Sequence, residues 1–368
     1  MTRKAHASHE VALFTGFPGF IGAKLLPRLL ELSPGATFKC LVQEKFVGLA
    51  KRQLEQIEAT HAHTRGRISL VLGDITRERL GIDAAEAKVL QRQITGGYHL
   101  AAVYDLAVKR DVGMKINVEG TRRVLEFLAE CKTFERLHYV STAYVSGTAV
   151  GVYRETDLDV GQSFKNYYEE TKFLAEVEVV RVGLPYSVYR PGIVVGDSRT
   201  GETAKFDGPY FALRAMTRLP SPGVFMKVGS GKRTINLVPV DFVVEALAQL
   251  AQARNGDGRT YHLTNPAPPT VFEVGELFAR ALGKSFVYMP VPLALAKLGL
   301  APGPVQKLFG MPAQTVDYFD HPVEYDCSQA TRDLSKAGVT CPPFQSYVQR
   351  LVAYYLEKQG SVRREAMV

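Results

Sequence analysis

The segment Val11–Gly22, VALFTGFPGFIG, constrains the fold of this 368-residue chain more than any other stretch. A short apolar run leads into three glycines at intervals of three residues, Gly16, Gly19 and Gly22. The pattern predicts a buried strand, a tight turn at Gly16, close approach of a ligand at Gly19 and helix–strand packing at Gly22. A helix starting here directs its free N–H groups and positive dipole end above the turn. We therefore expect an anion there, most simply a dinucleotide pyrophosphate.

The context of the turn supports this interpretation over an ordinary strand-to-helix turn. A helix-like stretch at 23–32 and a strand-like run at 38–42 follow it, which completes the βαβ unit that the motif requires. The turn supplies the first group of cofactor-binding residues that we expect, which are Thr15, Gly16, Phe17, Pro18, Gly19, Phe20, Ile21 and Gly22.

Three further strand-like runs, at 68–72, 98–102 and 137–140, alternate with helix-like stretches. This alternation predicts an α/β fold with a doubly wound parallel (Rossmann) sheet, whose ligands bind beyond the carboxyl ends of the strands. Asp74 follows the third run and is placed to accept from an adenine amino group, although capping the next helix is an equal alternative. The other expected contacts at these ends are Ile75 on the adenine ring, Ala101 and Ala102 along the cofactor, and Thr142 at the substrate.

Composition excludes several classes of protein. No apolar run is long enough to span a membrane, and residues 1–10 lack the apolar core of a secretion signal, so we expect a cytoplasmic protein. Four cysteines without a C-x-x-C pair give no disulfide framework and no metal site. The net charge of +8 is scattered rather than striped, which argues against nucleic acid and leaves open the steering of a polyanionic substrate.

Tyr168 and Lys172 are the candidate catalytic pair. They lie four residues apart on a helical pattern and therefore share one helix face. With 17 tyrosines in the chain such a spacing arises by chance, and Tyr354 with Lys358 repeats it, but only Tyr168 follows a strand end carrying Thr142. We expect the Lys172 ammonium to lower the pKa of Tyr168 and to bind the nicotinamide ribose. Thr142 then holds the substrate carbonyl oxygen, and Tyr168 delivers the proton.

Over residues 11 to 265 this set of motifs resembles the extended short-chain dehydrogenase/reductase superfamily. Within it, FTGFPGFIG, HYVSTAYVSG and YRPGIVVGDSRTGET resemble the fatty acyl-CoA reductases and the thioester reductase domains of carboxylic acid reductases. The resemblance implies that Asn117, in its Asn-Val-x-Gly-Thr run, steadies the active-site backbone and joins the catalytic set. It also implies that the nicotinamide lies beside Pro191, Gly192, Ile193 and Val194.

The end of the second strand bears on the choice of cofactor. An acidic residue there selects NAD, but this chain has Gln43 at that place. Thioester-reducing relatives often carry an arginine there, a pattern from which this sequence departs. Lys45 is placed to pair with a 2′-phosphate, so we favour NADP(H) over NAD(H).

The regular alternation stops after residue 200. We expect residues 1–200 and 232–264 to form the dinucleotide-binding domain, and 201–231 and 265–368 to form a smaller, mostly helical substrate lobe. The predicted function is NADPH-dependent reduction of a carbonyl compound or an acyl thioester of coenzyme A or a carrier protein. A nucleotide-sugar epimerase or dehydratase that retains its NAD is the alternative, and a homodimer is left open.

Overall fold

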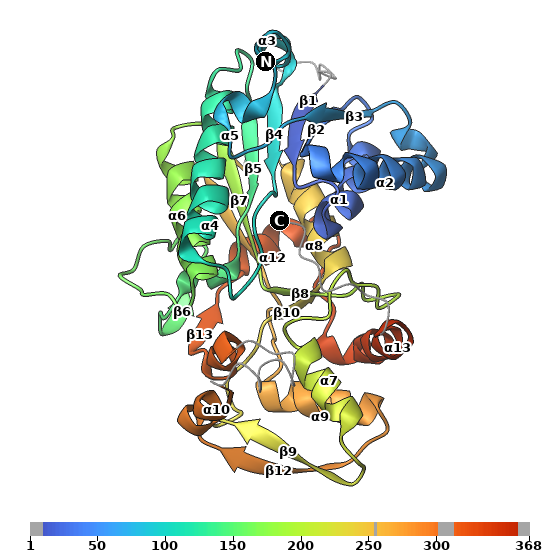
Figure 1. The fold of residues 1–368 in the computed structure, drawn as a ribbon, viewed down its shortest axis with the longest axis vertical. Coiled ribbons are helices and arrows are strands. Elements are labelled where there is room, and N and C mark those ends of the chain that lie inside the picture. The colour runs from blue at the N-terminus through green and yellow to red at the C-terminus, as the bar shows by residue number, and fades with distance from the viewer. Residues whose placement is uncertain (1–9, 254–255, 301–312, 360–368) are drawn as a thin grey trace.

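A seven-stranded parallel sheet forms the upper half of the molecule in the computed structural model, which describes residues 10–253, 256–300 and 313–359 (Figure 1). Its strand order is β11-β7-β5-β4-β1-β2-β3, and every neighbouring pair is parallel. The strands are β1 (Val11–Thr15), β2 (Thr37–Val42), β3 (Ile68–Leu72), β4 (Gly96–His99), β5 (Arg136–Val140), β7 (Tyr186–Pro191) and β11 (Arg259–Leu263).

Helices cover both faces of this sheet. In β1, Ala12 and Phe14 enter one hydrophobic core and Leu13 enters the other, which is the two-sided burial expected of a central parallel strand. The first core includes residues of α1 (Phe20–Leu32), α2 (Val47–Thr60) and α8 (Val240–Ala251), and the second those of α3 (Ala84–Gln93), α5 (Gly120–Ala129) and α6 (Tyr167–Arg181). The doubly wound fold is confirmed.

Several boundaries differ from the prediction. Helix α1 begins at Phe20 rather than at residue 23. The helix that carries Asn117 begins before this residue, with α4 (Arg110–Gly113) and a π-helical segment (Met114–Glu119) running directly into α5. The fourth strand ends at His99 rather than at Ala102. It ends there because the amide of Ala101 hydrogen-bonds the Thr15 hydroxyl, at 3.2 Å, instead of continuing the ladder.

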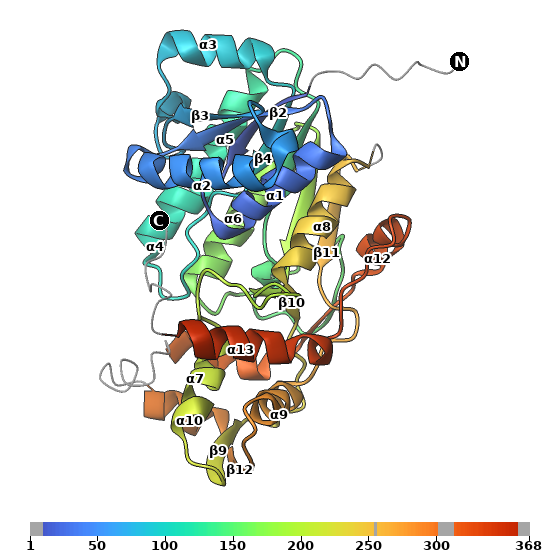
Figure 2. The same ribbon diagram turned by 90° about the vertical axis from the view of Figure 1, so that its right-hand side faces the viewer.

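A smaller lobe lies below the sheet in Figure 2. It is built around a core shared by α7 (Tyr210–Arg218), α9 (Val271–Ala281) and α13 (Val348–Lys358). The short strands β8 (Ile193–Val195) and β10 (Leu237–Pro239) join it to the sheet. Further elements include β6 (Gly151–Tyr153) paired with β13 (Val323–Tyr325), α10 (Leu293–Leu300), a 3₁₀ segment (Ala313–Asp320) and α12 (Ser328–Ser335). The division into domains stays a prediction, and α12 packs on β11 and α8 rather than on the lobe.

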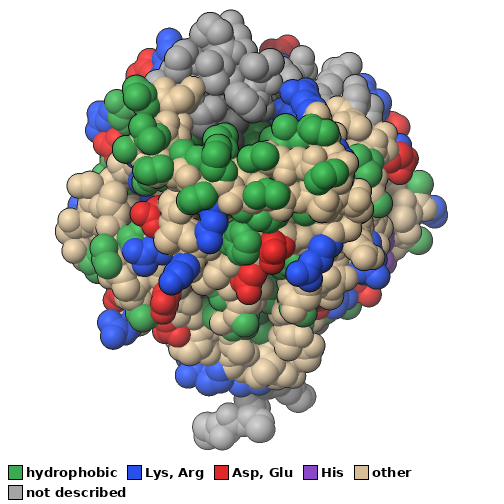
Figure 3. All heavy atoms as spheres, turned by 90° about the horizontal axis from the view of Figure 1, so that it is seen from below, with side chains coloured by type: hydrophobic (Ala, Val, Ile, Leu, Met, Phe, Trp, Pro, Cys, Tyr) green, Lys and Arg blue, Asp and Glu red, His purple; other side chains and the backbone are tan. Residues whose placement is uncertain are grey.

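The lobe also contains a parallel strand pair that the sequence did not predict, β9 (Gly223–Val228) with β12 (Phe286–Val291). Hydrophobic side chains gather at this end of the molecule when it is seen from below (Figure 3). The exposed large apolar residues of the pair are Val224, Met226, Val287 and Met289. Within the described residues, no helix is both long and apolar enough to cross a bilayer.

The glycine turn after β1 is packed more tightly than the sequence suggested. The amide of Gly19 donates to the carbonyl oxygen of Gly16 at 2.9 Å. A Cβ on either Gly19 or Gly22 would stand 2.6 Å from that oxygen. Gly16 itself has a φ of +95°, and a Cβ on it would meet the backbone of Leu100 at 2.9 Å. All three glycines are therefore required by close backbone packing, in addition to the ligand approach expected at Gly19.

Replacing Gly16 by alanine is expected to lower the free energy of unfolding by roughly 2–4 kcal/mol, because the new Cβ combines a positive φ with a backbone clash. Gly283→Ala is the matched control, since Gly283 has a φ of +64° and nothing within 4 Å of a Cβ. It is expected to cost about 1 kcal/mol. Urea denaturation measures both, and equal losses would show that the clash at Gly16 is unimportant.

Candidate active site

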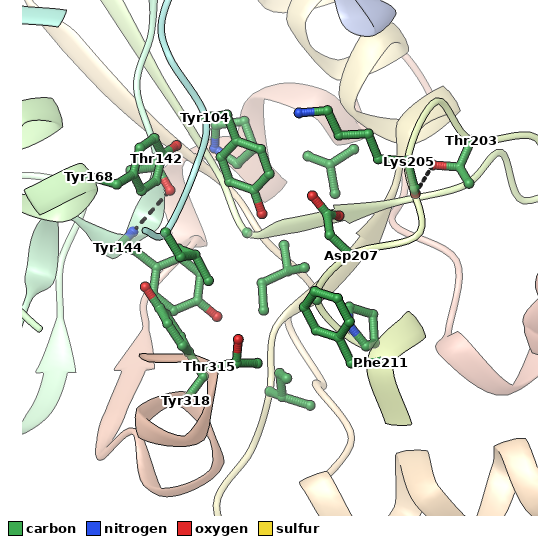
Figure 4. A pocket seen from close by; sticks show the side chains of 18 of the residues that line it. Tyr104, Thr142, Tyr144, Tyr168, Thr203, Lys205, Asp207, Phe211, Thr315 and Tyr318 are labelled. Carbon is green, nitrogen blue, oxygen red and sulfur yellow. Dashed lines mark hydrogen bonds between the residues drawn. The ribbon is translucent and has the colours of Figure 1, made fainter. Parts of the chain in front are cut away.

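A cavity of about 1030 Å³ runs from the glycine turn, past the carboxyl ends of the central strands, into the lobe. Its wall contains Thr142, Tyr168, Lys172 and every cofactor-binding residue expected from the sequence except Lys45. Asn117, expected in the catalytic set, does not line it either. The cavity therefore brings together residues from β1, β5, α6 and β8 that are far apart in the chain. Figure 4 shows Thr142 and Tyr168 side by side at its edge.

The end of the cavity at the glycine turn fits the diphosphate of a dinucleotide. Helix α1 begins after Gly19 with no side-chain cap and no acidic residue in its first turn, so its N–H groups and dipole are offered to an anion. At the start of the turn, the Thr15 hydroxyl and the His99 Nδ1 atom form a hydrogen bond at 2.7 Å. Burial, with a smaller effect of Lys172, lowers the pKa of His99 to about 3, so this ring is neutral.

At the expected adenine end, Asp74 closes a local turn rather than capping a helix. Its Oδ1 atom accepts from the amide and the hydroxyl of Thr76, at 2.8 and 2.9 Å, whereas the following 3₁₀ segment (Glu78–Gly81) begins after Arg77 with no side-chain cap. Asp74 also lines the cavity, as do Ile75 and Gln43. Lys45 stands in the 3₁₀ segment Glu44–Phe46 beside this end, with its ammonium 4.9 Å from the centre of the Phe46 ring.

Lys172 is tethered to the sheet below the cavity. Its ammonium donates to the Tyr139 hydroxyl at 2.9 Å and to the Val140 carbonyl oxygen at 2.8 Å, which fixes it at the end of β5. Burial lowers the pKa of Lys172 to about 7, and the negative charge of Glu176 one turn further along α6 opposes this only in part. Near neutral pH this amine therefore exchanges a proton readily.

Tyr168 differs from the prediction in one respect. We expected its pKa to be lowered by Lys172, but burial raises the pKa of Tyr168 above its ordinary value, while its hydrogen bond with Thr142 acts in the opposite direction. The phenol is therefore protonated in this structure. That state suits a proton donor to an oxygen that gains negative charge during reduction.

Thr142 follows β5 in extended conformation, with a φ of −150°, and caps the short 3₁₀ segment Ala143–Ser146. Its hydroxyl accepts from the Tyr144 amide at 3.3 Å (Figure 4). The side chain thus lies at the strand end beside Tyr168, where the sequence places a group that binds the substrate oxygen.

Asn117 acts on backbone rather than on the cavity. Its Oδ1 atom accepts from the Val103 amide at 2.9 Å, and its amide nitrogen donates to the Thr171 hydroxyl at 3.0 Å. It therefore ties the segment after β4 to the residue that precedes Lys172 on α6. This geometry is that of a positioning residue, which matches the steadying role implied by the family resemblance.

Sequence reasoning missed the charged network beneath the site. Arg190 and Glu176 form an ion pair at 2.6 Å and are almost fully buried. Glu176 also accepts from the hydroxyl of Ser141, the residue before Thr142. An ion pair buried this deeply holds β5, β7 and α6 in one arrangement, because breaking it would leave an uncompensated charge. Its partners are far apart in the sequence, so no local pattern signals it.

Many other residues that line the cavity were not predicted, among them Tyr104, Tyr144, Asp207 and Tyr318. Of these four, only Tyr144 had a signal, since it lies two residues after Thr142 in the motif HYVSTAYVSG. The others come from loops or 3₁₀ segments whose positions depend on tertiary packing.

The stability of the Lys172→Met variant should depend on pH in a defined direction. The amine has a pKa of about 7 when folded against 10.5 ordinarily, so between these values the unfolded chain holds an extra proton. The free energy of unfolding of the wild type must then rise relative to that of the variant as pH increases through this window. The advantage of the variant over the wild type is therefore largest below pH 7. Urea denaturation at about pH 6 and about pH 9.5 measures this.

Lys88→Met, on the exposed side of α3, is the matched control for loss of a lysine. If the difference in the free energy of unfolding between wild type and Lys172→Met were the same at both pH values, the Lys172 amine would not be desolvated as the structure indicates.

Three comparisons with known proteins agree on the family. Residues 14–247 match the family model described as male sterility protein. A linear gramicidin synthase of Brevibacillus parabrevis is 26% identical over 377 residues, which cover 96% of this chain and 7% of that protein. Fatty acyl-CoA reductase wat of Drosophila melanogaster is 26% identical over 269 residues, 63% of this chain and 52% of that protein. The chain thus spans only part of the length of both relatives.

Among solved structures, the terminal R domain from the myxalamid PKS-NRPS biosynthetic pathway superimposes with a TM-score of 0.80 at 26% identity. The match covers 96% of this chain and 92% of that one. The family model spans well over half of the present sequence. The chain therefore belongs to the male sterility protein family of extended short-chain dehydrogenase/reductases.

Proposed function

We propose that this protein is an NADPH-dependent reductase of acyl thioesters carried by coenzyme A or a carrier protein. The observation that carries the proposal is the meeting of Thr142, Tyr168 and Lys172 in one cavity that continues from an anion-binding turn to an apolar lobe. The similarity to a gramicidin synthase and to a fatty acyl-CoA reductase supports a thioester over a simple ketone.

The bound dinucleotide supplies the hydride, and the chain supplies position and protons. The open N-terminus of α1 holds the diphosphate, and Lys172 orients the ribose next to the nicotinamide while staying tethered to β5. Thr142 and Tyr168 hold the thioester carbonyl oxygen. As this oxygen gains negative charge, Tyr168 donates its proton. The resulting hemithioacetal then collapses to an aldehyde and a free thiol.

The lobe end of the cavity fits the acyl chain. Its wall is built largely from apolar side chains of α7, β9, α9 and α10, including Phe211, Phe225 and Phe278. Burying an alkyl chain there contributes about 0.8 kcal/mol for each CH₂ group. A homodimer and a cytoplasmic location, both expected from the sequence, stay predictions.

For the cofactor we propose NADP(H) over NAD(H). Gln43, in the cavity wall at the end of β2, places no carboxylate against a 2′-phosphate. Lys45, two residues further on, supplies a positive charge beside this end of the cavity.

Replacing Tyr168 by phenylalanine should lower kcat for NADPH-dependent thioester reduction by about 10²–10⁴-fold, because the proton donor is lost. Thr142→Val should lower kcat by roughly 10²-fold through loss of one hydrogen bond to the developing oxyanion. NADPH oxidation is followed with acyl-pantetheine thioesters, aldehydes and ketones as substrates. Binding of NADPH, measured by calorimetry, should change less than about threefold in both variants, since neither removes a contact to the phosphates.

Tyr354→Phe is the control, because Tyr354 has the same spacing to Lys358 but does not line the cavity. Wild-type turnover in Tyr168→Phe would refute the assigned role. Absence of NADPH oxidation with every substrate, together with NAD that remains bound through purification, would favour the epimerase alternative.

Cofactor choice is tested separately. Lys45→Ala should raise the Kd for NADPH about threefold to tenfold and leave the Kd for NADH nearly unchanged, because only NADPH carries the 2′-phosphate. Gln43→Asp should shift the preference toward NADH. If Lys45→Ala weakened both nucleotides equally, Lys45 would not be the phosphate contact.

A further inference from the structure

The loop between β8 and α7 presents two charged side chains to the cavity. Phe206 is 8% exposed and packs against Tyr210 and Tyr355 in the core of the lobe. Its two neighbours, Lys205 and Asp207, both line the cavity instead (Figure 4). Burial of the phenylalanine therefore determines that the two charged side chains face the ligand.

The backbone fixes the position of Asp207. Its carbonyl oxygen accepts from the Tyr210 amide at 3.1 Å, and the carbonyl oxygen of Gly208 accepts from the Phe211 amide at 3.1 Å, so Asp207 stands directly at the start of α7. Upstream, the Thr203 hydroxyl donates to the Lys205 carbonyl oxygen at 3.0 Å. The carboxylate is thus held by a defined turn at one side of the cavity.

The carboxylate of Asp207 has acceptor capacity that the protein does not use. Burial raises its pKa, and only the charge of Lys205 and its own backbone amide oppose this appreciably. Across the described residues, no other side chain makes a hydrogen bond or close ion pair with this carboxylate. The Lys205 ammonium lies instead over the Tyr104 ring, 5.7 Å from its centre.

Asp207 is close enough to the reaction centre to affect it. Its negative charge acts on the hydroxyl of Tyr168, the proposed proton donor, and on that of Tyr104. A second polar group lines the same cavity, the Thr315 hydroxyl, which is buried and has no partner among the described residues. Both groups lie around the space between Tyr168 and Phe211 (Figure 4).

A substrate must satisfy these groups or leave them unpaired. An unsubstituted alkyl chain would press against this partly buried carboxylate and exclude the remaining water from it, which is costly for a charged acceptor. A chain with a donor at this point would instead form a charge-assisted hydrogen bond. Sites that hydrogen-bond a substrate group discriminate strongly against analogues lacking it.

We propose that Asp207 is a specificity determinant that selects acyl thioesters bearing a hydrogen-bond donor, a hydroxyl, amide N–H or ammonium group, near the thioester carbonyl. This inference rests on the proposed function and adds the class of acyl chain.

The test compares octanoyl-pantetheine with its β-hydroxy, β-acetamido and β-amino derivatives. Wild-type enzyme should show kcat/KM at least about tenfold higher for one or more donor-bearing thioesters. In Asp207→Leu, kcat/KM for the donor-bearing thioesters should lie within about threefold of kcat/KM for octanoyl-pantetheine, and turnover of octanoyl-pantetheine should be retained. The preference of Asp207→Asn should fall between those of the wild type and Asp207→Leu. Asp111→Asn, on the exposed surface of α4, is the matched control and should leave the ratio unchanged.

Binding is measured in parallel by calorimetry, with NADP⁺ present and with amide analogues in which nitrogen replaces the thioester sulfur. Equal kcat/KM for all four thioesters in the wild type would overturn the proposal. So would an equal loss on every substrate in Asp207→Leu, or a rise confined to the KM for NADPH. If no thioester were reduced but the analogues bound with the Asp207-dependent preference, the proposed function would fail and this inference would stand.

Discussion

The carbonyl oxygen of Gly16 is the point on which the cofactor end of this structure depends. It accepts a hydrogen bond from the amide of Gly19. The backbones of Gly19 and Gly22 also pack so closely against it that neither residue could carry a Cβ. Because the turn is this tight, α1 begins directly above the end of β1 with its amides facing the cavity. The same turn approaches Leu100 closely, so it packs against the segment that follows β4. The proposed phosphate site therefore depends on backbone packing rather than on charged side chains.

The catalytic end depends on burial. Lys172 and Tyr168 are both removed from water, and each departs from its ordinary pKa toward its neutral form. The fold tolerates this because Lys172 is hydrogen-bonded to β5 and because the Glu176–Arg190 pair fixes the neighbouring strands and helix. The protonated phenol of Tyr168 suits the proposed reduction, in which the phenol gives up a proton and the substrate oxygen gains one. A bound oxidised nicotinamide would add a positive charge that favours the phenolate.

Much of this architecture could be predicted from the sequence because its signals are local. Glycine spacing and alternating apolar runs predicted the first five strands, and Thr142, Tyr168 and Lys172, expected at one site, do line one cavity. What was missed depends on tertiary contacts. β9 and β12 pair across about sixty residues, and Asp207 faces the cavity only because Phe206 is buried. The pKa of Tyr168 was predicted in the wrong direction because burial, which no spacing reveals, outweighs its neighbours.

Isotope transfer tests the central claim most directly. The purified protein is incubated with NADPH that carries deuterium at the reactive carbon and with an acyl-pantetheine thioester, and the products are analysed by mass spectrometry. The account predicts deuterium on the former carbonyl carbon of the released aldehyde or alcohol, together with one free thiol for each hydride first transferred. A product without deuterium, or label that stays on the nucleotide while the thioester is consumed, would contradict it.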